Sequence, residues 1–306
     1  MRRMMEAEGD TSLLLKSVER LNSSVTWSYD KHVDHERQAT KLPSCYANPT
    51  SVDAWRHRRM LDSVRPLTTE FPGSRWMTVG DGNFGSDAYF LERTGVKAVA
   101  TSISDSTLAL AKAQGLIQEF RVENAENISA PDASYDFVLC KESYHHFPRP
   151  SVAFYEMLRV AKTAVVLIEP SEGPVRLLDY LKIFVKTTIR NDESVLFETS
   201  GNFIYRLNIR EVEKMATALN LGCVAYRPFN DFYHPRLSGQ GFGTLSVATL
   251  LTKFGLAIQN ILCDLRLMNY GLTTVMVFKS LPSDDLRKKL KKAGFRLTIL
   301  AKNPYS

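Results

Sequence analysis

The chain has 306 residues, of which 44% are hydrophobic and 24% charged, with a formal net charge of +6. These fractions are ordinary for a globular protein and exclude a disordered, collagen-like or coiled-coil chain. Residues 283–306 carry seven Lys and Arg against two Asp, so most of the positive charge lies in that segment. The remainder is nearly neutral, which argues against a nucleic-acid partner.

We expect no membrane span, because even the most apolar stretch, residues 245–262, carries Lys253, Gln259 and Asn260. The apolar block near residue 13 is too short for a secretory signal, so we expect a cytoplasmic protein. The four cysteines are far apart and lack metal-ligand spacing, so we expect neither a disulfide framework nor a metal site. They are Cys45, Cys140, Cys223 and Cys263.

Residues 1–70 form a polar lead dotted with aromatic side chains, which we assign to an N-terminal helical cap. After Pro72 and Gly73, short apolar runs of strand length alternate with segments of helical period, which is typical of strand–helix–strand units in a parallel sheet. The predicted strands cover residues 76–79, 98–102, 117–122, 135–140 and 164–168. The predicted helices after the first, second and fourth of them cover 86–93, 106–114 and 151–160.

Beyond residue 170 the pattern predicts helices over about 175–189 and 210–219, an apolar helix over 245–267, and strands over 224–227 and 273–278. We therefore expect an α/β domain over 71–282 with a seven-stranded, mostly parallel sheet, insertions at about 171–209 and 229–271, and a basic tail over 283–306. The apolar helix is expected to be buried in the fold, with a homodimer surface as the open alternative.

A glycine-rich loop, Gly80-Asp81-Gly82-Asn83-Phe84-Gly85, lies between the first strand and the first helix of this domain. Glycines allow a sharp turn and the close approach of a ligand, and the helix N-terminus offers N–H groups to an anionic group. A dinucleotide-binding protein usually has an acidic residue about 20 positions further on for the ribose, whereas this chain has Ser102. A nicotinamide oxidoreductase is therefore the weaker interpretation.

Three later segments indicate better than the glycine loop which kind of ligand the site binds. They are Val122–Glu126, the strand ending at Cys140, and His145-His146-Phe147. In order and spacing, these segments and the glycine loop resemble the class I S-adenosylmethionine-dependent methyltransferase family over roughly residues 75–170. The resemblance implies a Rossmann-like fold, S-adenosylmethionine as cofactor, and cofactor-binding residues at the strand ends. They are Gly80, Asp81, Gly82, Phe84 and Gly85 beneath the methionine part, Ser102 and Ile103 at the ribose, Asn124 and Ala125 at the adenine, and Lys141 after the fourth strand.

The sequence departs from the family where acidic residues are usual, since it has Thr78 before the first glycine, Ser102 after the second strand and Asn124 after the third. Three outcomes stay open: weaker cofactor affinity, replacement by nearby acidic residues, or a scaffold that binds the cofactor without turnover. The acidic neighbours are Asp81, Asp105 and Glu126.

The resemblance implies methyl transfer, which requires the acceptor to be held in line with the methyl group and away from water. A general base is required only for a poorly acidic hydroxyl or amine. His145, His146 and Glu142 follow the fourth strand and are the candidates for catalysis. Alternatively, one histidine packs under the cofactor while the other bonds a loop, and Glu142 pairs with Lys141. Glu169, after the fifth strand, could likewise either orient the acceptor or form an ordinary ion pair.

Residues outside this core determine the acceptor. Tyr29 and His32, one helical turn apart, are expected to face the pocket with Trp27 and His35, although they could equally anchor the cap. The cluster at residues 230–234 offers mixed polar and aromatic surface. We expect a small-molecule acceptor, such as a carbohydrate or natural product, with RNA or protein as the rival.

Overall fold

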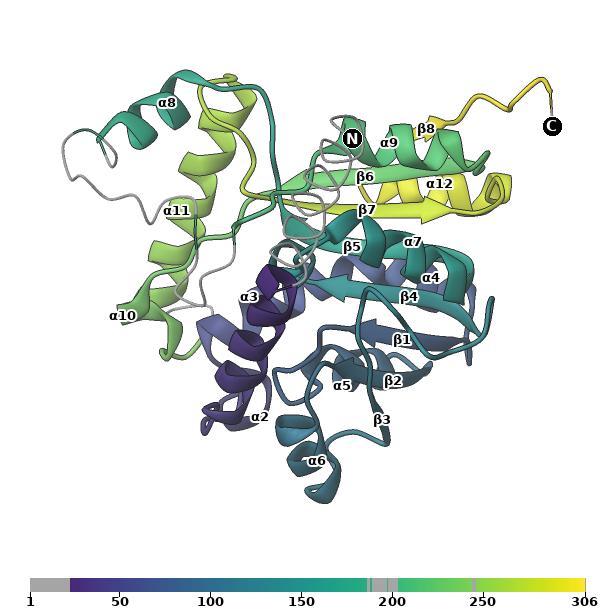
Figure 1. The fold of residues 1–306 in the computed structure, drawn as a ribbon. Coiled ribbons are helices and arrows are strands. Elements are labelled where there is room, and N and C mark those ends of the chain that lie inside the picture. The colour runs from purple at the N-terminus through teal and green to yellow at the C-terminus, as the bar shows by residue number, and fades with distance from the viewer. Residues whose placement is uncertain (1–22, 186–187, 189–196, 198–202, 244–245, 306) are drawn as a thin grey trace, which may run out of the picture.

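The computed structural model describes residues 23–185, 188, 197, 203–243 and 246–305. Within them the chain forms one sheet in the order β3-β2-β1-β4-β5-β7-β6-β8, with helices on both faces (Figure 1). The strands are β1 Arg75–Val79, β2 Lys97–Ser102, β3 Glu119–Val122, β4 Tyr135–Lys141, β5 Ala161–Pro170, β6 Cys223–Phe229, β7 Leu272–Phe278 and β8 Arg296–Ile299.

The strands from β3 to β5 in this order run parallel, and β7, β6 and β8 join them in antiparallel pairs. This arrangement confirms the predicted Rossmann-like α/β fold, with one strand more than the seven expected. The extra strand, β8, pairs with β6 from Arg296 to Ile299. Its four residues fall in the segment 283–306 that we expected to form a basic tail, and their pairing with β6 makes this part of the segment a strand of the sheet.

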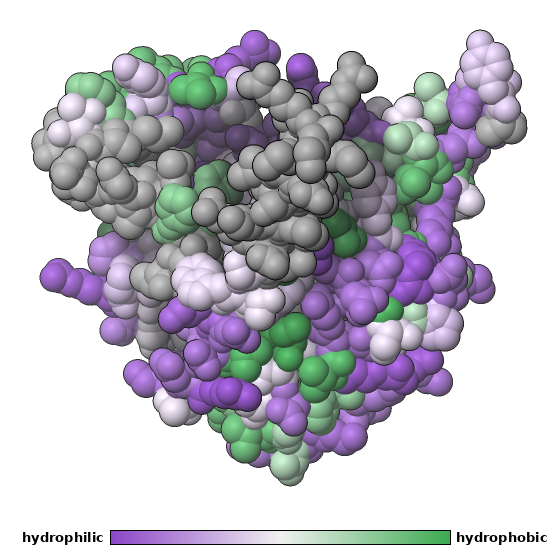
Figure 2. All heavy atoms as spheres, in the orientation of Figure 1, coloured by the Kyte–Doolittle hydropathy of each residue, from purple (hydrophilic) through white to green (hydrophobic). Residues whose placement is uncertain are grey.

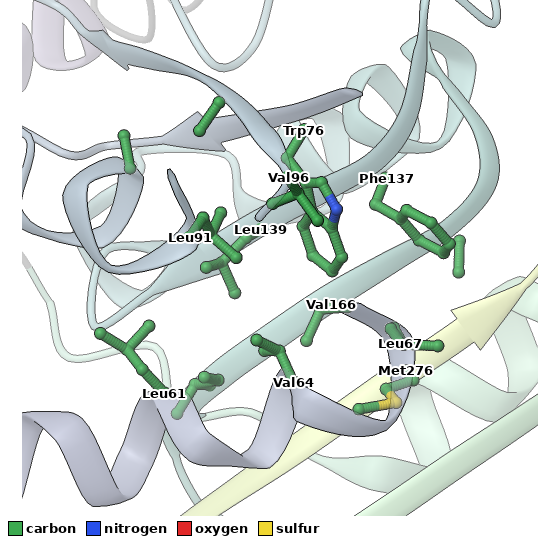
Figure 3. Close-up of a cluster of buried hydrophobic side chains, with 14 of the residues drawn as sticks. Leu61, Val64, Leu67, Trp76, Leu91, Val96, Phe137, Leu139, Val166 and Met276 are labelled. Atoms are coloured by element: carbon green, nitrogen blue, oxygen red, sulfur yellow. The ribbon is translucent and has the colours of Figure 1, made fainter. Parts of the chain in front are cut away.

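Apolar side chains alternate between the two faces of the sheet, as expected for strands buried on both sides. On one face Trp76 and Phe137 stack with ring centroids 4.6 Å apart and pack with residues of α3, α5 and α12 (Figure 3). On the other face Met77 and Val138 pack with α7 and α9. The indole N–H of Trp76 donates to Oγ of Ser74 at 3.0 Å, so this fully buried ring keeps its donor satisfied.

Helices connect the strands and form the outer layers. In the lead segment the structure describes a helix over residues 23–37, then α2 Ser44–Ala47, α3 Val52–Leu61, η1 Asp62–Val64 and α4 Arg65–Glu70. The others are α5 Ser86–Glu92, α6 Ser106–Ala113, η2 Tyr144–His146, α7 Pro150–Val160, α8 Leu177–Phe184, α9 Ile209–Ala218, α10 Pro235–Ser238, α11 Val247–Asp264 and α12 Asp284–Lys292. Met60, Leu61 and Leu67 of the lead are buried in the core, so this part of the lead packs directly on the sheet.

The predicted alternation of strands and helices between residues 76 and 168 is confirmed, with shifted boundaries. β3 begins at Glu119 rather than at 117, and β5 extends over residues 161–170 because it pairs with β4 at one end and with β7 at the other. α8 covers part of the helix predicted over about 175–189, and residues 186–187 and 189 lie outside the described residues.

α11 differs from the prediction that the apolar helix is buried in the fold. Its small residues and Leu256 face the protein, whereas its large apolar side chains are exposed. The exposed ones are Val247, Leu250, Leu251, Phe254, Ile258 and Ile261. Hydrophobic residues also gather on the surface around α8 (Figure 2). The prediction of full burial was wrong, and a homodimer surface stays a prediction.

None of the helices in the described parts of the chain has both the length and the hydropathy that crossing a membrane requires.

The cap of α12 provides a test of local stability. Oγ of Ser283 accepts a hydrogen bond from the N–H of Leu286 at 3.2 Å, which satisfies one of the free donors at the start of the helix. We expect Ser283→Ala to lower the free energy of unfolding by about 1 kcal/mol in urea denaturation. Ser283→Asp keeps an acceptor and should preserve most of the stability; an equal loss in both variants would contradict the capping role.

Candidate active site

The carboxyl ends of β1, β2 and β4 meet at one edge of the sheet, where the strand order reverses around β1. Ligands of open α/β sheets bind at such a point. A cavity of about 90 Å³ lies here, which we call the strand-end pocket. The sheet and its loops contribute Val79, Gly80, Ser102, Ile103, Glu123, Ala125, Ser143, His146, Phe147 and Pro148 to its wall.

Several residues predicted from the sequence meet at this pocket. Gly80, Ser102, Ile103 and Ala125, predicted to bind the cofactor, line it, and so does His146, a predicted base. Asn124 is next to Ala125 but is not among the lining residues, and its Oδ1 accepts a hydrogen bond from the N–H of Glu126 at 2.9 Å.

The N-terminal helix covers the pocket from the cap side. Tyr29 and His32 line it, as their spacing of one helical turn predicts, whereas Trp27 and His35 are exposed. Glu36, one turn beyond His32, lines it as well. No sequence motif marks Glu36, and the only signal that could have found it is the periodicity of residues 29, 32 and 36 on one helix face.

Glu36 lies against the end of β2. Its Oε1 accepts a hydrogen bond from the hydroxyl of Ser102, and its Oε2 is buried without a hydrogen-bond partner among the described residues. Burial raises the pKa of Glu36 to about 7, and the Ser102 hydrogen bond works against this rise. A Cβ atom at Gly82 would overlap the Glu36 carboxylate and lie 2.9 Å from Oγ of Ser102. The glycine at position 82 therefore makes room for this contact.

Asp81 holds the glycine loop onto α5. Its Oδ1 accepts from the N–H of Asp87 at 3.1 Å, and its Oδ2 accepts from the N–H of Ala88 at 2.9 Å and the hydroxyl of Thr78 at 2.8 Å. Burial and the neighbouring Asp87 carboxyl raise the pKa of Asp81 to about 8. Asp81 thus satisfies free N–H donors at the N-terminus of α5, and the Thr78 hydroxyl donates a further hydrogen bond to it.

The end of the glycine loop is shaped by two residues with positive φ. Phe84 has φ of 55° and Gly85 has φ of 66°. The Phe84 ring is buried in the core, and its carbonyl accepts a hydrogen bond from the hydroxyl of Tyr46 at 3.0 Å. Both residues predicted here from the family pattern therefore act on the shape of the loop, and neither is among the lining residues of the strand-end pocket.

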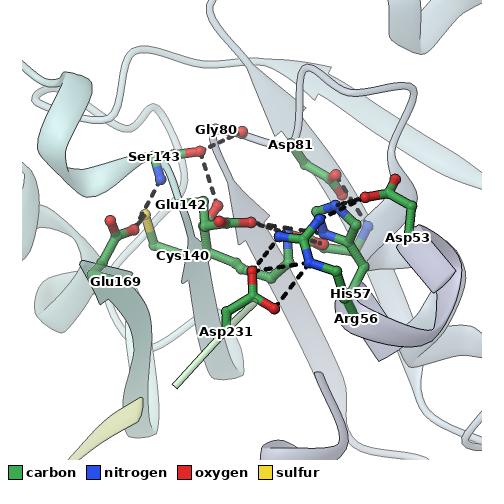
Figure 4. Close-up of polar contacts among 12 residues, drawn as sticks. Asp53, Arg56, His57, Gly80, Asp81, Cys140, Glu142, Ser143, Glu169 and Asp231 are labelled. Carbon is green, nitrogen blue, oxygen red and sulfur yellow. Dashed lines mark hydrogen bonds and ion pairs between the residues drawn. The ribbon is translucent and has the colours of Figure 1, made fainter. Parts of the chain in front are cut away.

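Lys141 and Glu142 belong to a charge network between β4, α5 and α3 (Figure 4). Nζ of Lys141 lies 3.3 Å from both Oδ1 of Asp87 and Oε2 of Glu142, and Nδ1 of His57 lies 3.7 Å from the same Glu142 oxygen. Burial works to raise the pKa of Glu142, but Lys141 and His57 outweigh it and lower that pKa below its ordinary value. The ion pair between Lys141 and Glu142, which we expected as the alternative to a catalytic role of Glu142, is therefore present.

A second cavity, of about 250 Å³, lies beside this network between α3 and α5. Asp53, His57 and Asp87 are among its lining residues. The glycine loop borders both cavities, since Gly80 lines the strand-end pocket and Asn83 lines this one.

His145 and Glu169 form a buried pair behind the strand-end pocket. Nδ1 of His145 lies 2.7 Å from Oε2 of Glu169, which is fully buried at the end of β5. The other carboxylate oxygen accepts from the backbone N–H groups of Ser143 and Tyr144, each at 2.9 Å. Glu169 therefore fixes the loop after β4 as well as the imidazole. The position of Glu169 at the end of a strand marked it as a candidate for the site, but the sequence did not indicate that it would pair with His145.

His146 links this pair to the pocket and the cap. Its ring lies 4.1 Å from that of His145 and 5.2 Å, edge to face, from that of His32, measured between centroids. The loop after β4 thus brings one histidine to the pocket wall and buries the other against Glu169.

The cluster at residues 230–234 has structural contacts away from the strand-end pocket. Asp231 pairs with Arg56 of α3, whose guanidinium also lies 4.8 Å from the ring centroid of Tyr233. Nδ2 of Asn230 donates to Oδ1 of Asn260 at 2.9 Å. The contacts with Arg56 hold the 229–271 segment against α3, and the Asn230 bond joins two parts of that segment. None of these three residues of the cluster lines the strand-end pocket.

A family described as "Methyltransferase domain" matches residues 77–168. No curated protein matches the chain.

Solved structures with a similar fold include methyltransferases and proteins described without a function. A putative sarcosine dimethylglycine methyltransferase from Galdieria sulphuraria is 17% identical, with 82% of this chain and 98% of that chain covered and a TM-score of 0.47. A possible histamine N-methyltransferase from Thermotoga maritima is 18% identical, with 74% and 92% covered and a TM-score of 0.45. The YcgJ protein from Bacillus subtilis is 17% identical, with 74% and 100% covered and a TM-score of 0.46.

The matched domain runs from β1 to β5 and contains the glycine loop, the strand ends and the histidine pair. Its strands β1 to β5 pair in parallel, as the sequence led us to expect, and the strand-end pocket lies at their carboxyl ends. Residues 77–168 of the chain therefore form a methyltransferase domain.

Proposed function

We propose that the strand-end pocket binds the nucleoside of S-adenosylmethionine and that the chain methylates a small-molecule acceptor beside it. The observation that carries this proposal is the pocket itself, which lies at the carboxyl ends of the parallel strands between the glycine loop and the N-terminal helix. Ile103 and Ala125 supply apolar wall for an adenine ring, while Ser102 and Glu36 supply polar groups.

Two features of the described residues fit the cofactor. Gly80, which lines the pocket, has φ of 74°, and a Cβ atom there would lie 2.5 Å from Cβ of Ser143, so only glycine fits between the pocket and the loop after β4. The buried Oε2 of Glu36 has no hydrogen-bond partner among the residues that the structure describes, which leaves an acceptor for a ligand donor. Bound S-adenosylmethionine would supply a methyl group on a positively charged sulfur.

In this proposal the predicted cofactor residues divide into two groups. Gly80, Ser102, Ile103 and Ala125 contact the cofactor, with Asn124 beside the adenine. Four of the remaining candidates hold the loop that carries these contacts, through helix capping, backbone shape and ion pairing; they are Asp81, Phe84, Gly85 and Lys141. The fifth, Gly82, leaves room for the Glu36 carboxylate. Residues 1–70 serve as the cap, 71–282 as the transferase domain, and 283–306 as its basic end.

His146 is the proposed general base, because it lines the pocket and can accept a proton from an acceptor hydroxyl or amine near neutral pH. His145 is a positioning residue, since its imidazole is held by Glu169 behind the ring of His146. Glu142, the third candidate, is engaged with Lys141 and His57 and keeps the end of β4 in place.

A small acceptor is favoured over a macromolecule by the position of the positive charge. Lys289 of α12 pairs with Glu70 and Arg287 pairs with Asp284, so part of the basic segment is neutralised on the face of the sheet that carries α4. The strand-end pocket is lined by residues of the N-terminal helix and has no Lys or Arg among its lining residues.

The test is a transfer assay with methyl-labelled S-adenosylmethionine and an extract separated by ultrafiltration into small molecules and macromolecules. Label transferred only in the small-molecule fraction supports the proposal, and label fixed on RNA or protein overturns it. Calorimetric titration with S-adenosylhomocysteine should show binding, and its absence would overturn the assignment of the pocket.

The role of His146 gives a kinetic prediction. His146→Asn is expected to lower kcat by about 10²-fold or more while S-adenosylhomocysteine affinity changes little, because a lost base slows proton removal. The measurement is kcat as a function of pH. The variant should lose the increase of kcat with pH that accompanies deprotonation of the general base in the wild-type enzyme. His234→Asn on the exposed end of α10 is the matched control and should keep wild-type kcat. Equal kcat in both variants would remove His146 from the mechanism.

A further inference from the structure

The strand-end pocket contains a carboxylate that comes from neither the glycine loop nor a strand. Glu36 reaches the end of β2 from the N-terminal helix and accepts a hydrogen bond from Ser102 with one oxygen. The other oxygen is buried and has no partner in the described part of the chain. Burying an acceptor without a donor costs free energy, so the arrangement is incomplete without a further hydrogen-bond donor.

The charge on this carboxylate is poorly compensated by the protein. Burial raises the pKa of Glu36 to about 7, and the hydrogen bond from Ser102 only partly opposes this rise. A ligand that supplies neutral hydroxyl donors would therefore stabilise the ionised form through short, charge-assisted hydrogen bonds. The acidic neighbours considered from the sequence do not supply this group, because Asp81 caps α5, Glu126 pairs with Arg149, and Asp105 is exposed.

The chemistry around Glu36 indicates which ligand group it recognises. An ionised carboxylate only accepts hydrogen bonds, and its two oxygens match two adjacent hydroxyl donors. Resting on the function proposed above, we infer that Glu36 binds the vicinal hydroxyls of the cofactor ribose, so that the cap supplies the acid missing at Ser102.

This assignment gives the cap a part in binding. The cavity of about 90 Å³ is smaller than the roughly 300–1,000 Å³ of ligand pockets, so the N-terminal helix has to shift outward when a nucleoside enters. Glu36 then exchanges the Ser102 hydroxyl for those of the ribose. Gly82 permits the exchange, because a side chain there would overlap the carboxylate.

The test compares Glu36→Gln with wild type for two ligands, S-adenosylhomocysteine and its 2′,3′-dideoxy analogue, by calorimetric titration. Glutamine keeps the shape but loses the charge and one acceptor. We expect the variant to bind S-adenosylhomocysteine about 10–100-fold more weakly and the dideoxy analogue with nearly unchanged affinity. Asp34→Asn on the exposed face of the same helix is the matched control and should bind both ligands like wild type.

The other outcomes separate the two proposals. Unchanged affinity of Glu36→Gln for S-adenosylhomocysteine overturns the role of Glu36 and leaves the cofactor assignment intact. An equal loss for both ligands also overturns it, because a merely structural role does not distinguish the ribose hydroxyls. No binding of S-adenosylhomocysteine by the wild-type protein overturns the proposed function and this inference together. Unfolding midpoints of both variants verify that each is folded.

Discussion

Replacing Glu169 with alanine is expected to lower the free energy of unfolding by about 3–5 kcal/mol. The fully buried carboxylate accepts from the N–H groups of Ser143 and Tyr144 and binds the imidazole of His145. Removal of the carboxylate takes this acceptor away from the two N–H groups and the imidazole at a fully buried position. The measurement is urea denaturation followed by circular dichroism.

Two variants control this prediction. Glu169→Gln keeps one carbonyl oxygen in the same place and should lose less stability than alanine, because some of the N–H donors stay satisfied. Glu119→Ala removes a half-exposed carboxylate on β3 that pairs with Arg75 of β1 and with Arg121 of β3, and it should cost less than about 1 kcal/mol. A loss in Glu169→Ala no larger than that of Glu119→Ala would show that the carboxylate does not hold the loop after β4.

Gly82→Val is expected to weaken S-adenosylhomocysteine binding by about 100-fold or more. A Cβ atom at this position overlaps the Glu36 carboxylate, and a valine side chain also extends toward the end of β2 at Ser102. The bulk therefore displaces the cap side chain and fills the space between the glycine loop and the N-terminal helix. The measurement is calorimetric titration together with the unfolding midpoint.

Stability and binding are expected to respond differently to Gly82→Val. The atom it meets is the end of a flexible glutamate side chain, which can move, so the unfolding midpoint should change little. Gly239→Val makes the same substitution at a glycine whose Cβ would meet nothing within 4 Å, and it should leave affinity unchanged. Wild-type affinity in Gly82→Val would contradict the placement of the nucleoside in this pocket.

The local pattern of the sequence was sufficient to predict the central fold. Buried parallel strands appear as short apolar runs, and the helices between them follow a period of 3.6 residues, so the segment from β1 to β5 could be predicted element by element. The carboxyl ends of parallel strands lie on one edge of the sheet, and the family resemblance implied that Gly80, Ser102 and Ala125 lie there. These three residues and His146 line one pocket at that edge.

Contacts between distant segments could not be predicted in this way. β8 exists because β6 offers an unpaired edge, and α11 exposes its large apolar side chains because its small residues face the protein. Lys141 and Glu142 follow β4 as a binding residue would, yet tertiary contacts with Asp87 and His57 pair them with one another.

The sequence by itself predicted the α/β class, because that class depends on local periodicity, and its resemblance to a known family implied the cofactor. Only the tertiary structure decided that Glu36 meets Ser102 and that Glu169 holds His145. The physical reason is that a hydrogen bond between residues 66 or 24 positions apart leaves no periodic signal in the sequence. It arises when the packing of the sheet and the cap brings the two side chains within reach.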